Sequence, residues 1–190
     1  MKKNTKILLF EGAYILLLLA MFLLPLFSAP EISITRNTLS ELGAQFSPFS
    51  WIMNSIFAAL ALSAVISGWG CYEGFVFLRI ILVLFGISLV LSAIFNLAPV
   101  NPEIRYNIRE DGWHLYFACT TWITFIILTF STALILEKQA DRLLAVITGI
   151  SAVLLSILAS EADRTAGVWQ RLLFITSFGW MIYTFKKIDY

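Results

Sequence analysis

Six long apolar segments, separated by short polar connections, constrain the fold of this chain more than any other feature. They cover residues 7–27, 49–70, 80–97, 114–136, 143–160 and 168–185. About 20 apolar residues in a helix can cross a hydrocarbon core of about 30 Å, and a helix satisfies its own backbone hydrogen bonds in lipid. The sequence therefore predicts an all-α, polytopic membrane protein, with residues 1–190 forming one bundle of six transmembrane helices.

The composition excludes several classes of protein. Charged residues make up 13% of the chain and hydrophobic residues 59%, whereas soluble domains carry about 25% charged residues. The net charge of +1 provides no basic surface for nucleic acid. One histidine and two cysteines, Cys71 and Cys119, are too few for a zinc site of the usual kind. The sequence therefore predicts no metal, no cofactor and no nucleic-acid partner.

The basic residues predict the orientation of the bundle. Six spans place both chain ends on one side, and that side would hold all six lysines together with Arg79 and Arg142. The opposite side would hold the remaining five arginines. The positive-inside rule then makes both termini cytoplasmic. The first apolar segment is longer than the 7–15-residue core of a usual signal peptide, so we interpret it as a retained span.

The outer side is predicted to carry the polar chemistry. The three larger polar loops, residues 28–47, 98–113 and 161–167, all face outward in this topology. Polar residues also fall in the outer halves of the spans: Asn54, Ser92, Asn96, Thr121, Ser156 and Ser160. They fit the lining of an outward-facing pocket, but small polar residues also form packing seams between membrane helices.

His114, the only histidine, stands where the second outer loop turns into the fourth span, in NPEIRYNIREDGWHLYFACTT (residues 101–121). Asp111 or Gly112 as helix N-cap would place His114 in the first turn, where the helix dipole disfavours protonation. A neutral imidazole there is a candidate general base, with Glu41 or Asp111 orienting it, or a ligand-binding group. The alternative is an interfacial histidine that is hydrogen-bonded to a loop.

Arg171 lies about one turn into the sixth span, in GVWQRLLF. A guanidinium inside a span costs several kcal/mol unless it is paired or reaches water. The candidate partners are the outer acids Glu41, Asp111, Glu161 and Asp163. A structural salt bridge is one interpretation. An anion site for a lipid phosphate or carboxylate is the other, because arginine binds such groups in bidentate fashion.

The first outer loop contains RNTLSELG, residues 36–43. Ser40 and Glu41 could be read as a nucleophile and its base, although no GxSxG-like elbow surrounds the serine. A short helix capped by Ser40 or ended by Gly43 explains the same residues.

Three stretches, NTLSELGA, GWHLYFA and GVWQRLLF with Trp180 further along, resemble the prokaryotic six-span family known as domain of unknown function 998. The resemblance covers residues 8–185 and implies the same fold and topology in a prokaryotic cytoplasmic membrane, but no activity. The recurring positions of that family correspond here to Ser40, Glu41, Leu42, Gly43, His114, Gln170 and Arg171. The stretch PVNPE replaces an acidic turn of many members, which leaves Asp111 as a substitute acid. Topology and first loop are also similar to eukaryotic six-span proteins of the FGF-receptor-activating and autophagy-modulator type.

The leading functional hypothesis is a membrane protein whose outward-facing polar pocket binds a lipid headgroup or small amphiphile. Arg171 would anchor an anion, with His114 as its hydrogen-bonding partner and Ser40, Glu41 and Gln170 as further ligand-binding residues. An intramembrane hydrolase that uses His114 as general base is the alternative. A small transporter is a third reading, although the spans show no buried acid at the midplane and no inverted repeat. Membrane lipids, a second copy of the chain or another membrane protein are the expected partners.

Overall fold

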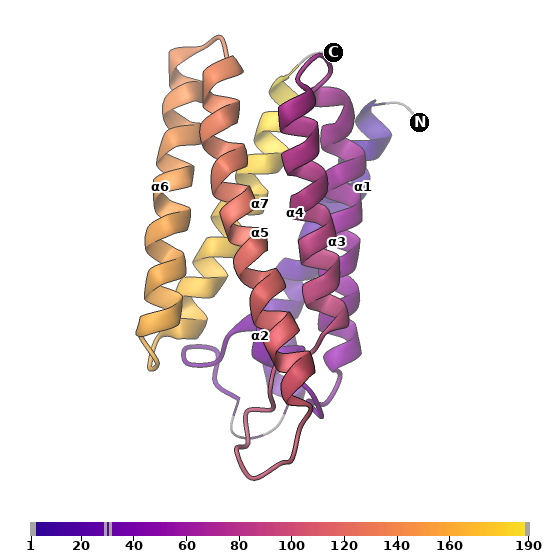
Figure 1. Ribbon diagram of the computed structural model, residues 1–190, viewed down its shortest axis with the longest axis vertical. Helices are drawn as coiled ribbons and strands as arrows, with labels where there is room; N and C mark the ends of the chain where they lie inside the picture. The colour runs from indigo at the N-terminus through magenta and orange to yellow at the C-terminus, as the bar shows by residue number, and fades with distance from the viewer. Residues whose placement is uncertain (1–2, 29, 31, 189–190) are drawn as a thin grey trace.

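The computed structural model describes residues 3–28, 30 and 32–188, and this part of the chain is all-α (Figure 1). Lys2, which counted toward the predicted orientation, lies outside the described residues. The elements are α1 (Lys3–Leu23), the 3-10 helix η1 (Leu24–Phe27), α2 (Leu39–Leu42), α3 (Ser50–Cys71), α4 (Val76–Ile94), α5 (Ile108–Ile135), α6 (Gln139–Glu161) and α7 (Ala166–Lys187). The predicted all-α fold is confirmed.

Five of these helices are long and apolar enough to cross a membrane: α1 with η1, α3, α4, α5 and α6. The chain is therefore a multi-pass membrane protein. The sixth predicted span corresponds to α7, which has 22 residues like α3 but a less apolar sequence. Gln170 and Arg171 lie in its second turn, and they lower its hydropathy.

α7 is enclosed by protein rather than placed at the edge of the bundle. Eleven of its 22 residues are buried, compared with four of 23 in α6. Phe174 stacks on Phe57 of α3 with ring centres 5.3 Å apart, and Trp180 meets Phe125 of α5 edge-on at 5.9 Å. Because other helices cover much of its surface, α7 can carry polar side chains that would be costly against lipid.

Both ends of the described chain lie at the same end of the bundle, here called the termini end (Figure 1). Lys3 Nζ donates a hydrogen bond to the Ile188 carbonyl oxygen at 2.6 Å, and Lys186 pairs with Glu11. The loops 32–49, 95–107 and 162–165 lie at the opposite end, here called the loop end. The polar loops that the sequence placed on one side thus meet in space.

The lateral surface of the helix bundle is apolar over a distance similar to the thickness of a membrane. Leu134, for example, is 82% exposed. Trp51 and Trp69 are exposed at opposite ends of α3. They are 18 residues apart, which is about 27 Å along a helix. Exposed tryptophans at both ends of a helix are typical of residues at the two membrane–water interfaces.

Candidate functional site

The first loop of the loop end, between α1 and α3, is built around α2, a single helical turn. Thr38 caps this turn, and Glu41 Oε2 accepts hydrogen bonds from Thr38 N at 2.5 Å and Thr38 Oγ1 at 2.9 Å. Glu41 Oε1 also accepts from Asn37 Nδ2 at 3.2 Å. The predicted cap at Ser40 is therefore wrong, whereas the predicted helix end at Gly43 is confirmed. The Glu41 carboxylate holds the loop together and makes no hydrogen bond to Ser40 or His114.

Arg171 holds this loop against the membrane helices. Its side chain is 3% exposed. Its Nη1 donates to the carbonyl oxygens of Ile34 at 2.7 Å, Asn37 at 2.8 Å and Gly167 at 2.9 Å. Its Nε donates to the Met21 carbonyl oxygen at 3.1 Å. One guanidinium therefore ties together the end of α1, the first loop and the start of α7.

The salt bridge expected for Arg171 is not formed in the described part of the chain. The guanidinium bonds only main-chain oxygens, and none of the four predicted acidic partners reaches it. The reason is local: the last turn of a helix and an irregular loop leave carbonyl oxygens without partners, and a buried guanidinium has five N–H donors to offer them. Its Nη2 is buried without a hydrogen-bond partner among the described residues, but Arg171 lines neither of the two cavities described below.

The two longer loops of the loop end are joined to each other by amide side chains. Gln45 Nε2 donates to the Asn96 and Asn107 carbonyl oxygens, and Gln45 Oε1 accepts from Asn107 N at 2.9 Å. Asn54 Nδ2 donates to Asn96 Oδ1 at 2.8 Å. Asn54 and Asn96, predicted to line a pocket, thus serve to join α3 to the end of α4.

His114 lies in the second turn of α5, because this helix begins six residues earlier than the predicted span. Asn107 is the N-cap and accepts hydrogen bonds from the amides of Arg109 and Glu110. The predicted caps Asp111 and Gly112 are therefore wrong. Asp111 lies inside the helix and accepts from Ala98 N at 2.7 Å.

The imidazole of His114 is fixed by the end of α4. The residue is 4% exposed, and its Nδ1 lies 2.7 Å from the main-chain carbonyl oxygen of Ser92 and 2.8 Å from that of Phe95. Carbonyl oxygens only accept, so Nδ1 carries a proton, and in the neutral ring Nε2 is an acceptor. No described residue hydrogen-bonds to Nε2. Neither Glu41 nor Asp111 contacts the ring, so the carboxylate expected to orient His114 is replaced by main-chain carbonyls.

His114 lines a cavity of about 450 Å³ between α5, α6 and α7, here called the lateral cavity. Its polar residues near the loops are Thr38, Ser40, His114, Ser160 and Gln170, and Ser156 lies one turn deeper in α6. Its walls are otherwise mostly apolar and include Leu115, Ala118, Trp122, Ile123, Ile126, Ile157 and Leu173. No aspartate, glutamate, lysine or arginine lines it.

Gln170 links this cavity to the first loop. Its Oε1 accepts from Leu39 N, the first amide of α2, at 2.5 Å. That bond fixes the amide plane and leaves the Nε2 group without a hydrogen bond in the described chain. The structure thus gathers Ser40, His114 and Gln170 around one cavity, whereas Glu41 and Arg171 lie behind it as supports for the loop.

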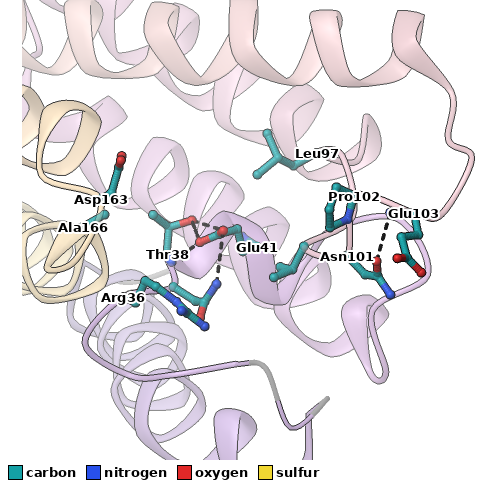
Figure 2. A pocket seen from close by; sticks show the side chains of 11 residues that line it. Arg36, Thr38, Glu41, Leu97, Asn101, Pro102, Glu103, Asp163 and Ala166 are labelled. Atoms are coloured by element: carbon teal, nitrogen blue, oxygen red, sulfur yellow. Dashed lines mark hydrogen bonds between the residues drawn. The ribbon is translucent and has the colours of Figure 1, made fainter.

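A second cavity of about 750 Å³, here called the loop cavity, lies among the three loops of the loop end. Figure 2 shows Asp163 and Glu103 on opposite sides of it, with Glu41 turned toward Thr38 between them. Thr38 and Leu97 line both cavities, so the loop cavity and the lateral cavity adjoin. Within the described ranges, no group of three or more His, Cys, Asp or Glu residues is placed to hold a metal ion.

The sequence analysis missed several residues of this site. Cys119 and Trp122 line the lateral cavity without any local motif that marks them. Thr38 did carry a signal, because the T-x-x-E pattern of residues 38–41 is that of a capping box. Leu97 belongs to an apolar run, and only its contact with both cavities identifies it.

Comparison with known proteins gives one result. A family model described as "protein of unknown function (DUF998)" matches residues 13–185. No curated protein and no solved structure matches the chain.

Proposed function

Because this chain belongs to the DUF998 family, whose function is unknown, we propose its function from the site itself. The protein is a six-span protein of a prokaryotic cell membrane with both termini in the cytoplasm. Its outward-facing loop end binds a lipid headgroup or small amphiphile in the lateral cavity.

The sixth span is supported by the path of α7. This helix starts at the loop end and finishes beside Lys3. Its 22 residues extend over about 33 Å, the length of the other spans. Lys186 and Lys187 in its last turn join the basic residues of the termini end, which favours a cytoplasmic location for that end.

Cysteine labelling in intact cells tests this topology. In a chain with Cys71 and Cys119 replaced by alanine, Asp163→Cys and Lys187→Cys place thiols just before and at the end of α7. We expect an impermeant maleimide to label Asp163→Cys in intact cells and Lys187→Cys only after the cells are opened. Labelling of both variants in intact cells would show that α7 does not cross the membrane.

The lateral cavity carries the proposal of amphiphile binding. Its hydrogen-bonding groups lie at one end, near the loops, and its deeper walls between α5, α6 and α7 are apolar. A molecule that is polar at one end and apolar along its length matches this division. His114 and Gln170 would contact the headgroup, and Trp122 and Ile126 the apolar chain. Arg171 supports the loop above the cavity, so we assign it a positioning role.

Mass spectrometry of the purified protein tests this function. Ala118 is a small residue of the cavity wall, and Ala118→Phe would fill part of the space. We expect a bound amphiphile to copurify with the wild type and to be lost from Ala118→Phe. Ala58→Phe is the matched control, because Ala58 is a partly buried alanine of α3 that lines neither cavity. Equal lipid content in all three proteins would contradict the proposal.

An intramembrane hydrolase is a second candidate, favoured by one observation: Ser40 and His114 line the same cavity. With Nδ1 fixed by carbonyl oxygens, His114 Nε2 is free to take a proton from a water molecule that attacks an ester. The ester would yield an acid and an alcohol. Hydrolysis of a long-chain ester by the wild type, lost in His114→Asn, would support this activity. No turnover above the rate without protein would exclude ester hydrolysis under the assay conditions.

A further inference from the structure

The lateral cavity contains no ionic group that would hold a charged ligand. None of its lining residues is charged, and the nearby Arg171 directs its bonded N–H groups at the backbone. The adjoining loop cavity is lined by Glu41, Glu103 and Asp163 against a single basic residue, Arg36. An anionic headgroup would lose its hydration without gaining a cation, and the surrounding carboxylates would repel it.

The polar end of the lateral cavity offers both kinds of hydrogen-bonding partner. His114 Nε2 is an acceptor, because Nδ1 holds the proton that bonds the Ser92 and Phe95 oxygens. Gln170 Nε2 is a donor, because its Oε1 is bound to Leu39 N. The Ser40 hydroxyl can donate or accept.

A hydroxyl group on the ligand matches this set. It can donate to His114 Nε2 and accept from Gln170 Nε2 at the same time. A fully ionised phosphate or carboxylate only accepts, so it would leave the Nε2 of the neutral ring unpaired.

The shape of the cavity favours a single apolar chain. Its volume of about 450 Å³ is in the lower half of the ~300–1,000 Å³ typical of small-molecule sites. The ribbons of α5 and α6 separate toward the loop end (Figure 1), and the exposed side chains of Leu115, Ile123 and Ile157 line the cavity between them. A chain can therefore enter sideways from the lipid while its polar group stays near the loops.

From these observations we infer that the lateral cavity is selective for an uncharged, hydroxyl-bearing, single-chain amphiphile, such as a long-chain alcohol or a monoacylglycerol. The inference rests on the proposed function and specifies its ligand. It also replaces Arg171 with His114 and Gln170 as the groups that recognise the ligand.

The chain contains its own reporter for this site. Cys119 is exposed and lines the lateral cavity, whereas Cys71 is buried in α3. In nanodiscs of phosphatidylcholine, N-ethylmaleimide should therefore alkylate Cys119 first, and intact mass measures the rate. A ligand seated beside Cys119 will slow the reaction.

Three probes with the same chain separate the possible headgroups: dodecan-1-ol, dodecyl phosphate and dodecylamine, each at the same mole fraction in the bilayer. We expect dodecan-1-ol to slow alkylation roughly tenfold at saturation and the two charged probes less than about twofold, because each lost or mismatched hydrogen bond weakens binding several-fold. Stronger protection by either charged probe, or equal protection by all three, would overturn the inference and leave amphiphile binding intact. If none of the three probes slows the alkylation of Cys119, and Cys119 of Ala118→Phe is alkylated at the wild-type rate, the proposed function is contradicted as well.

Three variants of the polar residues at the cavity test the recognition itself. Asparagine at position 114 keeps a donor near the Nδ1 position and removes the Nε2 acceptor, so His114→Asn should fold and require roughly tenfold more dodecan-1-ol for half protection. Ser40→Ala should require roughly threefold more. If folded His114→Asn binds dodecan-1-ol like the wild type, Nε2 does not contact the ligand and the inference is wrong. If His114→Asn does not fold, Gln170→Glu decides, because it keeps the acceptor for Leu39 N and removes the donor. Unchanged dodecan-1-ol protection in that variant would overturn the inference.

Discussion

Arg171 and His114 occupy similar positions and have opposite uses. Both are almost fully buried at the loop end, with exposed fractions of 3% and 4%. The bonded nitrogens of Arg171 all donate to backbone oxygens of three different segments. His114 bonds the backbone only through Nδ1, its Nε2 makes no hydrogen bond to a described residue, and the residue lines a cavity. One residue supports the site, and the other is available to a ligand.

The difference follows from the chemistry of the two side chains. A guanidinium keeps its charge in proteins, so burial requires the protein to bind most of its donors. An imidazole can be neutral, and one nitrogen can remain unpaired at the edge of a cavity at small cost. A buried arginine beside an apolar span is therefore weaker evidence for a ligand site than a histidine with one fixed and one free nitrogen.

Removal of the guanidinium is expected to have the largest effect. Arg171→Leu leaves the carbonyl oxygens of Met21, Ile34, Asn37 and Gly167 without their donor, and the expected loss is roughly 3–5 kcal/mol of unfolding free energy. Arg171→Lys should recover only part of it, because one ammonium cannot reach all four oxygens. Thermal unfolding in detergent measures both. A stable Arg171→Leu protein that has lost its lipid would reverse the comparison and make Arg171 the ligand anchor.

A smaller loss is expected from Gly167, where α7 approaches the first loop closely. A Cβ at this position would lie 2.4 Å from the Asn37 oxygen and 2.6 Å from the Ile34 oxygen. Gly167→Ala must push the loop away from Arg171 and should cost roughly 1–3 kcal/mol. Gly112→Ala in α5 is the control, since nothing lies within 4 Å of its added Cβ, and it should gain up to about 1 kcal/mol. Equal melting temperatures for the two variants would show that the loop adapts freely.

The fold could be predicted largely from periodic apolar runs, because lipid leaves few alternatives to a helix. The start of α5 was missed, since residues 109–112 are three charged residues and a glycine and extend the helix ahead of the predicted membrane segment. Asn107 was the detectable signal, as a good N-cap at the start of a polar turn. α7 was predicted from its length, and its polar residues are tolerated because neighbouring helices enclose it.

The site could be predicted only in part. Ser40, His114 and Gln170 come from different segments, and the structure brings them to one cavity. The partners of Arg171 could not be read from the sequence, because they are backbone oxygens whose positions depend on the path of the loop. The same holds for His114, whose fixed tautomer depends on where α4 ends beside α5.

Variants of Glu41 distinguish a structural role of this loop residue from a ligand-binding role. Its carboxylate completes the capping box of α2, so Glu41→Ala should cost about 1 kcal/mol of stability. Glu41→Gln, which keeps an acceptor for Thr38 N, should cost less. Binding of dodecan-1-ol by the folded Glu41→Gln protein should match the wild type. A large loss of binding without a loss of stability would place this carboxylate at the ligand.

The smallest effect is expected at the serines of α6 that the sequence suggested as polar lining. Ser156 Oγ and Ser160 Oγ each donate to a carbonyl oxygen three residues earlier in the same helix, at 2.9 Å in both cases. Their polarity is thus used within α6, although both residues border the lateral cavity. Ser160→Ala should change the unfolding free energy by less than about 0.5 kcal/mol. Dodecan-1-ol should protect Cys119 from N-ethylmaleimide in this variant as well as it does in the wild type. A clear loss of protection in Ser160→Ala would move the headgroup from the α5–α7 side of the cavity to α6, because the hydroxyl would then have left its own helix to bind the ligand.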